Sequence, residues 1–354
     1  MKKMRMLALI LSFLGIILIA CFGVYTYNSS PVDKSSKAKI EVVIPSGMST
    51  SNIAKTLKDK GLIRSEFFFK LYLKLNHVSS LKASTYLLTK SMSLKDIVSE
   101  LYEGKMSKSS LLILTFKEGK TVSDYATLIE KETNISKDDF LNKINDTEFL
   151  GNLINKYWFL TEDILNSDIY YKLEGYLFPD TYEFVKDDLT SEKIITTLLD
   201  EEEKKLESYK SDLQKNNIHS IMTLASMAEL EGVSDSDRKF IVSVFNNRLR
   251  KNMNLGSDVT TYYAFKESMD KDLTTEMFNT YNPYNTRSSK MAGKLPVGPI
   301  CNPSLSSILA SLYPETSDYL YFVADKNRKV YFMKSAKEHQ AKVKELKDSG
   351  DWIW

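Results

Sequence analysis

A run of twenty largely apolar residues near the N-terminus constrains this chain more than any other feature. Residues 6–25 carry no charge, and Lys2, Lys3 and Arg5 precede them. As a helix rising about 1.5 Å per residue, the run spans about 30 Å, the thickness of a bilayer's hydrocarbon core. By the positive-inside rule, residues 1–5 stay in the cytoplasm and everything behind the run is exported. The sequence therefore predicts a single-pass plasma-membrane protein whose main part is extracytoplasmic.

Two other interpretations of this run have to be weighed. A cleaved signal peptide has a shorter apolar region and a small-residue cleavage site, and no clear site follows residue 25. Residues 18–21, LIAC, are similar to a lipobox, which would make Cys21 a lipidated N-terminus. Residues 22–25 continue the apolar run, where a lipoprotein normally turns polar. The length of the run favours an intact helix, and lipidation of Cys21 stays the alternative.

The rest of the chain has the composition of a globular protein. It has 354 residues in all, of which 43% are hydrophobic and 27% charged, and this length suggests two or three folded units. A formal net charge of +2 gives no overall field that would favour nucleic acid as a partner. Two cysteines and three histidines disfavour a disulfide framework and a His-rich metal site. We therefore predict no nucleic-acid partner, no metal and no cofactor.

A Ser-rich tether and a small α+β unit follow the apolar run. Residues 26–38 lack apolar periodicity and are predicted to form the tether. The unit over residues 39–106 is predicted from its patterns, which are a strand at 40–44, a helix capped by Ser49 or Thr50, a helix from Ser65, a strand at 81–88 and a helix at 93–104.

The pattern of strand, turn and helices returns about 72 residues later. Residues 118–121, EGKT, repeat the turn and cap of residues 46–49, SGMS. Further on, residues 65–67 correspond to residues 136–140 with a small slip. A strand–turn–helix–helix unit used outside a membrane resembles the LysM glycan-binding module. The resemblance implies glycan contact by residues 39–106, and a purely structural α+β unit is the alternative.

The C-terminal half contains polar segments that packing alone does not require. The first, residues 174–182, EGYLFPDTY, places Glu174 and Asp180 on either side of a turn with one Gly and one Pro. Aromatic residues such as Tyr176 lie between these two carboxylates. Sugar rings stack on aromatic faces and hydrogen-bond to carboxylates, so this turn is a candidate glycan contact. A structural turn clamped by aromatic side chains is the alternative.

The second segment, residues 219–250, begins with a helix that is apolar on opposite faces, which predicts a buried helix. It ends with Glu229 and Glu231 before Gly232, a residue suited to stopping a helix. Residues two apart on a helix point about 160–200° from each other. Glu229 therefore faces the core or a neighbouring helix, and Glu231 lies on the side of Leu224 and Met227. Apolar neighbours and the negative helix end predict a raised pKa for Glu231, as a general acid needs. A surface Glu at a frayed helix end is the alternative.

A third polar segment supplies loops rather than regular elements. It runs through residues 257–262 and 282–286 to 295–304, and its Pro and Gly content indicates rigid loops that carry amides and hydroxyls.

Six motifs of the chain form a recognisable set: ASMAELEG with SVFNNRLR, EGYLFPDTY, SDVTTYYA, PYNT, LPVGPICNPS and YLYFVAD. Together they resemble the YceG-like (MltG) family of endolytic murein transglycosylases over essentially the whole chain. The resemblance implies an α+β fold with a transmembrane helix, a LysM-like unit over 39–106 and a YceG-like catalytic domain over 107–354. The family's catalytic glutamate, the second of its E-x-E motif, falls on Glu231.

The resemblance implies cleavage of the β-1,4 bond between N-acetylmuramic acid and N-acetylglucosamine within nascent glycan strands, leaving 1,6-anhydro ends. One carboxyl can suffice, because the attacking hydroxyl belongs to the sugar itself. The expected partners are glycan strands of peptidoglycan, the plasma membrane and peptidoglycan synthases of the elongation machinery. The candidate substrate-binding residues are Glu174, Tyr176, Asp180, Glu229, Asn247, Arg248, Asp258, Thr260, Tyr284, Asn285, Thr286 and Pro296.

The chain departs from the family pattern at two places. Lys329 and Val330 stand where the family usually has a Gly-His pair, and Arg287 stands where an aromatic residue is common. These departures concern substrate contacts and leave Glu231 in place.

Two other functions compete with a transglycosylase. A hydrolytic muramidase would use Glu174 or Asp258 to activate water. A non-catalytic scaffold would use the LysM-like unit to hold cell-wall synthases on glycan, but the polar segments around Glu231 favour an enzyme.

Overall fold

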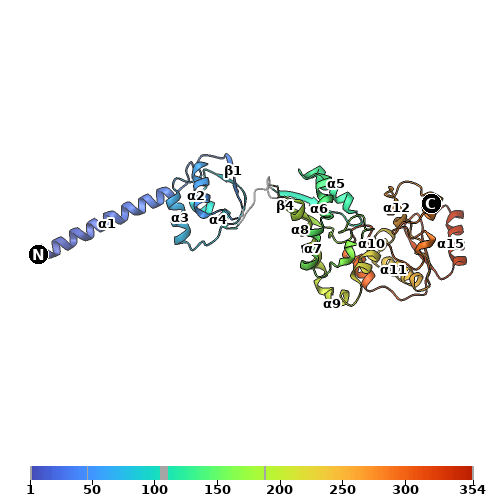
Figure 1. The fold of residues 1–354 in the computed structure, drawn as a ribbon. Coiled ribbons are helices and arrows are strands. Elements are labelled where there is room, and N and C mark those ends of the chain that lie inside the picture. The colour runs from blue at the N-terminus through green and yellow to red at the C-terminus, as the bar shows by residue number, and fades with distance from the viewer. Residues whose placement is uncertain (1, 46, 104–110, 187–188, 353–354) are drawn as a thin grey trace. The chain divides into compact units, whose positions relative to one another are not determined.

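A computed structural model describes residues 2–45, 47–103, 111–186 and 189–352. The chain forms two compact units, Met1–Ile113 with Glu183–Asp188 and Leu114–Tyr182 with Leu189–Trp354. The predicted domain boundary between residues 106 and 107 lies outside the described residues. Helices and strands occur in both units, which confirms the α+β expectation (Figure 1).

The first unit pairs two strands and packs helices on them. Its elements are α1 (Lys2–Ser29), β1 (Lys39–Ile44), α2 (Thr50–Asp59), α3 (Glu66–Leu75), β2 (Ser84–Thr89) and α4 (Leu94–Glu103). β1 and β2 are antiparallel, with Lys39 opposite Thr89 and Ile44 opposite Ser84. Their inward side chains, among them Val42 and Tyr86, are fully buried with residues of the three shorter helices.

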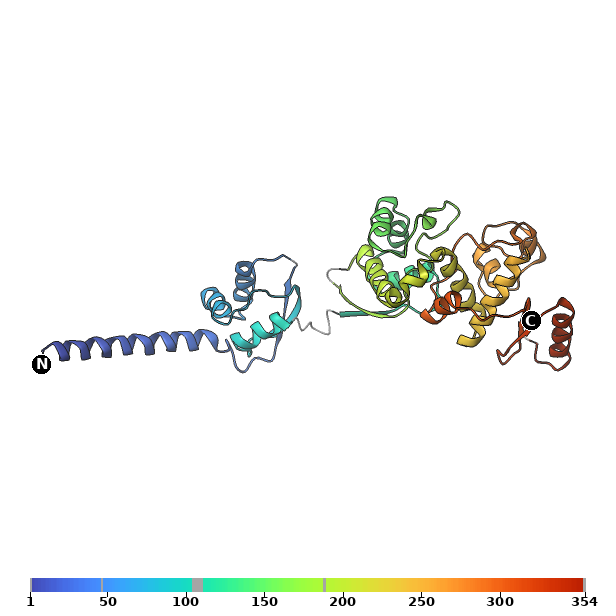
Figure 2. The same cartoon turned by 90° about the horizontal axis from the view of Figure 1, so that it is seen from below.

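α1 projects from its unit as one uninterrupted helix (Figures 1 and 2). Among the residues whose side chains are described, no helix combines the length and the apolar character that crossing a membrane requires. The predicted span over residues 6–25 falls in part on residues 6–12, 14 and 21, whose side chains lie outside the described set. The alternative of a lipid on Cys21 lies outside it as well.

The helix continues to Ser29, so the first four residues of the predicted tether are helical. Arg64 accounts for this extension, because its guanidinium donates to the carbonyls of Tyr27 (3.1 Å), Ser30 (2.6 Å) and Pro31 (2.7 Å). Carbonyls at a helix C-terminus have no partner within the helix, and Arg64 supplies one. The chain behind α1 is therefore held on the first unit.

The internal repeat predicted from the sequence recurs in the structure. β3 (Leu111–Thr115), α5 (Val122–Glu132) and α6 (Lys137–Ile144) follow one another as β1, α2 and α3 do. Ala54 and Ala126 are fully buried in corresponding helices, and so are Leu57 and Ile129.

The second helix of each copy corrects one detail of the predicted alignment. Ser65 and Ser136 are the N-cap residues, and the fully buried aromatic side chain four residues on is Phe69 in one copy and Phe140 in the other. Phe67, which we aligned with Phe140, is 67% exposed. A helix repeats a face after four residues and not after two, so burial and not sequence likeness fixes the correspondence.

The remaining elements build the second unit around one buried helix, except that residues 183–185 belong to the first unit. They are α7 (Thr147–Lys156), β4 (Thr181–Val185), α8 (Ser191–Leu206), α9 (Lys210–Leu213), α10 (Ile218–Glu231), α11 (Asp235–Arg250), α12 (Asp258–Phe265), α13 (Thr275–Asn279), α14 (Leu305–Leu312), β5 (Tyr321–Ala324), β6 (Val330–Met333) and α15 (Ala336–Asp348). β3 pairs with β4, and β5 with β6 in antiparallel register. Every residue of α10 from Ile218 to Ala228 is buried except the partly exposed Ser220, which confirms the predicted buried helix. α10 packs on α11, α12 and α14 and carries its C-terminal end to the candidate site.

Candidate active site

α10 ends at Glu231, and Gly232 caps it by donating its N–H to the carbonyl of Ala228 at 2.9 Å. The predicted stop is confirmed, but its reason differs from the one we expected. Gly232 has φ −97°, which any residue adopts. A Cβ there would lie 2.6 Å from Cγ of Arg238 and 3.1 Å from the carbonyl oxygen of Ala228. Glycine is therefore needed because α11 approaches the end of α10 closely.

Glu231 is partly exposed, with its carboxyl against the loop that precedes α12. Ser257 Oγ donates to its Oε1 at 2.6 Å. Burial raises the pKa of Glu231 and the negative charge of Asp258 raises it further, while the Ser257 hydrogen bond and the positive charges of Arg287 and Arg248 oppose that rise. The net direction is upward, which confirms the predicted raised pKa of Glu231. The carboxyl therefore keeps its proton to a higher pH than an ordinary glutamate.

A buried hydroxyl network fixes Ser257 beside Glu231. The Ser257 N–H donates to Thr286 Oγ1 at 3.0 Å, and Thr260 Oγ1 donates to the Ser257 carbonyl at 2.7 Å. The two threonine hydroxyls also bond to each other at 2.8 Å. Thr260 and Thr286 are fully buried, so they orient Ser257 and do not face an incoming ligand. We did not single out Ser257 from the sequence, although it directly precedes Asp258 in the SDVTTYYA motif.

Asp258 begins α12, so residues 258–262 are helical and do not form the rigid loop that we predicted there. Asp258 forms an ion pair with Arg287, whose guanidinium lies 4.8 Å from the Phe278 ring centroid. Both charged side chains are about half exposed. Arg287 is one of the positions where the chain departs from the family pattern. The structure brings it into the electrostatic surroundings of Glu231.

Arg248 and Asn247 of α11 hold the chain that leads into β5. Arg248 Nε donates to the Leu320 carbonyl at 2.6 Å, and its guanidinium lies 5.0 Å from the Tyr321 ring centroid. The Asn247 amide donates to the carbonyls of Ser317 and Tyr319, both at 2.8 Å. The charge of Arg248 reaches Glu231, whereas Asn247 is buried in structural contacts.

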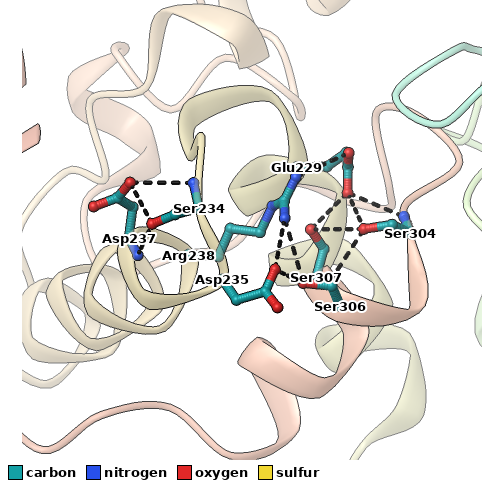
Figure 3. Close-up of polar contacts among 8 residues, drawn as sticks. All are labelled: Glu229, Ser234, Asp235, Asp237, Arg238, Ser304, Ser306 and Ser307. Carbon is teal, nitrogen blue, oxygen red and sulfur yellow. Dashed lines mark hydrogen bonds and ion pairs between the residues drawn. The ribbon is translucent and has the colours of Figure 1, made fainter. Parts of the chain in front are cut away.

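Glu229 points to the start of α14 (Figure 3). Glu231 contacts Ser257 instead, so the two carboxyls have different neighbours, as the helical geometry predicts. Its Oε2 accepts from the Ser304 N–H at 3.0 Å and from the hydroxyls of Ser304 and Ser307, both at 2.6 Å. Arg238 Nη2 lies 3.5 Å from Oε1. Only 7% of the Glu229 side chain is exposed. Glu229 thus joins the end of α10 to the N-terminus of α14 and to α11.

Glu174 is enclosed in the second unit. Its carboxyl accepts from the Val122 N–H and the Tyr263 hydroxyl, both at 2.9 Å, and from the Asn302 amide at 3.4 Å. Burial raises the pKa of Glu174 to about 8. Since Glu174 is only 1% exposed, its carboxyl offers no oxygen to a bound glycan and ties the start of α5 to α12.

The other candidate residues occupy structural positions or the surface. The Tyr176 hydroxyl bonds to His219 Nδ1 at 2.9 Å. The Asn285 amide donates to the carbonyls of Met277 and Thr280. Asp180 is exposed and pairs with Lys205 at 3.6 Å. Tyr176, Tyr284, Asn285 and Pro296 are all buried. The structure therefore gathers Arg248, Asp258, Thr260 and Thr286 around Glu231 and leaves the others in the framework.

One partly buried carboxyl with a raised pKa, next to half-exposed charged groups, is the arrangement of an enzyme that works through a single acid. Comparison with known proteins agrees with this class. The model of the YceG-like family matches residues 42–345, and the chain belongs to that family.

Two relatives from different bacteria have the same functional name. The chain is 39% identical over 329 residues to the endolytic murein transglycosylase of Bacillus subtilis, covering 91% of this chain and 89% of that protein. It is 34% identical over 362 residues to the protein of the same name from Streptococcus pneumoniae strain D39, covering 96% and 65%. A crystal structure of a YceG-like protein of Listeria monocytogenes is 40% identical and covers 86% of this chain and 99% of that one, with a TM-score of 0.61.

The ion pair between Asp258 and Arg287 gives two predictions, because its two members shift the pKa of Glu231 in opposite directions. Arg287→Gln removes a positive charge that lowers the pKa of Glu231, so that pKa should rise. Asp258→Asn removes a negative charge that raises it, so the pKa should fall. A carbon-13 NMR titration of the Glu231 carboxyl in both variants measures the two shifts. Shifts in the same direction would contradict the assignment.

Proposed function

We propose that this protein is an endolytic murein transglycosylase. It cleaves the β-1,4 bond between N-acetylmuramic acid and N-acetylglucosamine inside a glycan strand and leaves a 1,6-anhydro end. The observation that carries the proposal is Glu231, a carboxyl with a raised pKa at the end of a buried helix. Membership of the YceG-like family supports the substrate class.

The reaction needs one proton donor that becomes a base. Glu231 gives its proton to the glycosidic oxygen, and the bond to C1 breaks with its electron pair passing to that oxygen. The Glu231 carboxylate then takes the proton of the sugar's own C6 hydroxyl while that oxygen bonds to C1. The nucleophile belongs to the substrate, so its effective concentration is high and no second carboxyl has to activate water. The cycle returns Glu231 to its protonated form.

The neighbours of Glu231 serve both halves of this cycle. Ser257 Oγ donates to Oε1 at 2.6 Å, so the proton for transfer belongs on Oε2. The same hydrogen bond becomes charge-assisted once Glu231 is a carboxylate, which stabilises the intermediate stage. Asp258 is about half exposed and provides negative charge where the sugar ring becomes positive.

A hydrolytic muramidase is the second candidate. Glu174 is enclosed and does not suit the role of water-activating base. Asp258 is more exposed but is engaged in an ion pair with Arg287. Mass spectrometry of cleaved glycan separates the two functions, because hydrolysis gives products one water heavier than the anhydro form.

Glu231→Gln should abolish cleavage, with a loss of at least about 10²–10⁴-fold, because the amide is nearly isosteric but has no transferable proton. The matched control is Glu229→Gln two residues away, which points an amide N–H₂ at the donors of Ser304 and Ser307. We expect that control to lose about 1–3 kcal/mol of unfolding free energy and to keep part of the activity. Anhydro-end formation from uncrosslinked glycan and thermal unfolding measure the two effects. An active Glu231→Gln with a dead Glu229→Gln would reverse the assignment.

The LysM-like unit over residues 39–106 is proposed to improve encounter with long glycan and to take no part in bond cleavage. Its strand, turn and helix order supports this role. Deleting residues 39–106 should lower cleavage of long strands and leave turnover of short soluble glycan unchanged. Rates on the two substrates provide the test. Equal loss on both would mean that the unit is an integral part of the catalytic fold.

We also propose that residues 6–25 anchor the protein in the plasma membrane, with the catalytic part outside the cell and near the synthases that make new strands. The uncharged run and the positive charges before it support this topology. Cys21→Ala removes the lipidation alternative without adding charge. The variant should stay in the membrane fraction with no loss of a lipid-sized mass. Release from the membrane, or such a loss, would favour a lipoprotein.

A further inference from the structure

The turn at residues 118–121, between β3 and α5, packs on the residues that precede Glu231. The Gly119 N–H donates to the Asn302 carbonyl at 2.9 Å, and the Asn302 N–H donates to the Lys120 carbonyl at 2.9 Å. A Cβ on Gly119 would lie 3.3 Å from Leu230 Cδ2 and 3.7 Å from Glu229 Cγ. The turn therefore lies so close to the last turn of α10 that a methyl group added at Gly119 would contact Leu230.

The same turn in the first copy of the repeat makes no such contact. Gly47 has φ +79° and Gly119 has φ +71°, and each lies two residues before the N-cap of the following helix. A Cβ on Gly47 would meet nothing within 4 Å. The two glycines therefore share a backbone conformation, but of the two only Gly119 is placed where an added Cβ would meet another part of the fold.

Hydrogen bonds also link this turn to the C-terminal end of α10. Asn302, which is fully buried, accepts at Oδ1 from the N–H groups of Gly175 (3.0 Å) and Leu177 (3.1 Å). Two residues later, the N–H and hydroxyl of Ser304 bind Glu229. The turn is thus linked to Glu229 through Asn302 and Ser304, and it also lies close to Leu230.

We propose that the turn at residues 118–121 is a positioning element of the active site, which holds the last turn of α10, and with it Glu231, against the loop of Ser257. This role deepens the proposed function and rests on Glu231 being the acid. A general acid must stay within hydrogen-bond reach of the oxygen that it protonates, and small displacements are costly. The second copy of the repeat thereby becomes part of the catalytic apparatus.

Gly119→Ala tests the proposal, with Gly350→Ala as its matched control. Gly350 has the same φ of +71°, belongs to the same unit, and a Cβ on it would meet nothing within 4 Å. Both variants carry the same backbone strain, but only Gly119→Ala presses on Leu230. On short soluble glycan we expect kcat to fall about tenfold or more in Gly119→Ala with KM unchanged, and to stay near the wild-type value in Gly350→Ala.

The pH profile separates positioning from a general loss of stability. If the last turn of α10 loosens, Glu231 gains water, and the alkaline limb of its kcat profile moves to lower pH. Equal kcat in the two alanine variants, or a loss with no shift of this limb, would overturn the proposal.

Leu230→Ala covers the case in which Gly119→Ala does not fold. It removes the same contact from the helix side without backbone strain and should also lower kcat at constant KM. The double variant should lose no more than the worse single one, because Leu230→Ala deletes the Cδ2 atom on which a methyl at position 119 would press. Additive losses would contradict the proposal. An inactive wild-type enzyme, or an active Glu231→Gln variant, would instead count against the proposed function itself.

Discussion

A carboxylate at the N-terminus of a helix holds this candidate active site together. Glu229 accepts from one backbone N–H and two hydroxyls at the start of α14, where the helix dipole also favours negative charge. Without it these buried donors would have no comparable partner, and leaving a buried donor unsatisfied costs about 1–3 kcal/mol. Because Glu229 lies two residues before Glu231, the same contact fixes where the reacting carboxyl stands. In the E-x-E motif, Glu229 thus holds the fold together, and Glu231 is left for the reaction.

The position of the reacting carboxyl, Glu231, depends more on hydroxyl groups than on charged side chains. Thr260 and Thr286 are fully buried and act on Glu231 only through Ser257. Short hydroxyl side chains hold the loop at van der Waals distance while satisfying its backbone groups, which a charged residue could not do without a desolvation cost. The charges of Asp258 and Arg287 stay about half exposed at the edge of this network, where they adjust the pKa of Glu231.

Most of the features that the sequence predicted correctly follow from helical periodicity. The pattern of α10 predicted a buried helix, and the opposite faces of Glu229 and Glu231 followed from a spacing of two. The internal repeat was visible because turn and cap residues recur, but its second helix was misaligned at Phe67, since only packing distinguishes it from Phe69. Local rules could supply these features because each depends on residues close together in the chain.

Contacts between residues far apart in the chain could not be predicted from the sequence. Asn302 joins the turn at 118–121 to the segment at 174–177, and no local pattern indicates that a single Asn spans such distances. Polar motif residues such as Asn285 were expected to touch substrate because of the resemblance to a glycan-cleaving family. The structure uses its amide to satisfy backbone carbonyls instead. Polar character predicts that a side chain has a partner but does not say whether that partner is ligand or protein.

The burial of Glu174 makes the folded chain more stable at low pH than at high pH. Its pKa of about 8 means that the folded chain keeps a proton that the unfolded chain releases near pH 4.5. The stabilising contribution of this proton is complete below about pH 4.5, declines as the pH rises from there, and is lost once the pH has passed through 8. In alkaline surroundings the carboxyl would have to hold a charge between α5 and α12, with only the Val122 N–H, the Tyr263 hydroxyl and the Asn302 amide to solvate it. The join between the repeat and the catalytic helices therefore weakens as the pH rises.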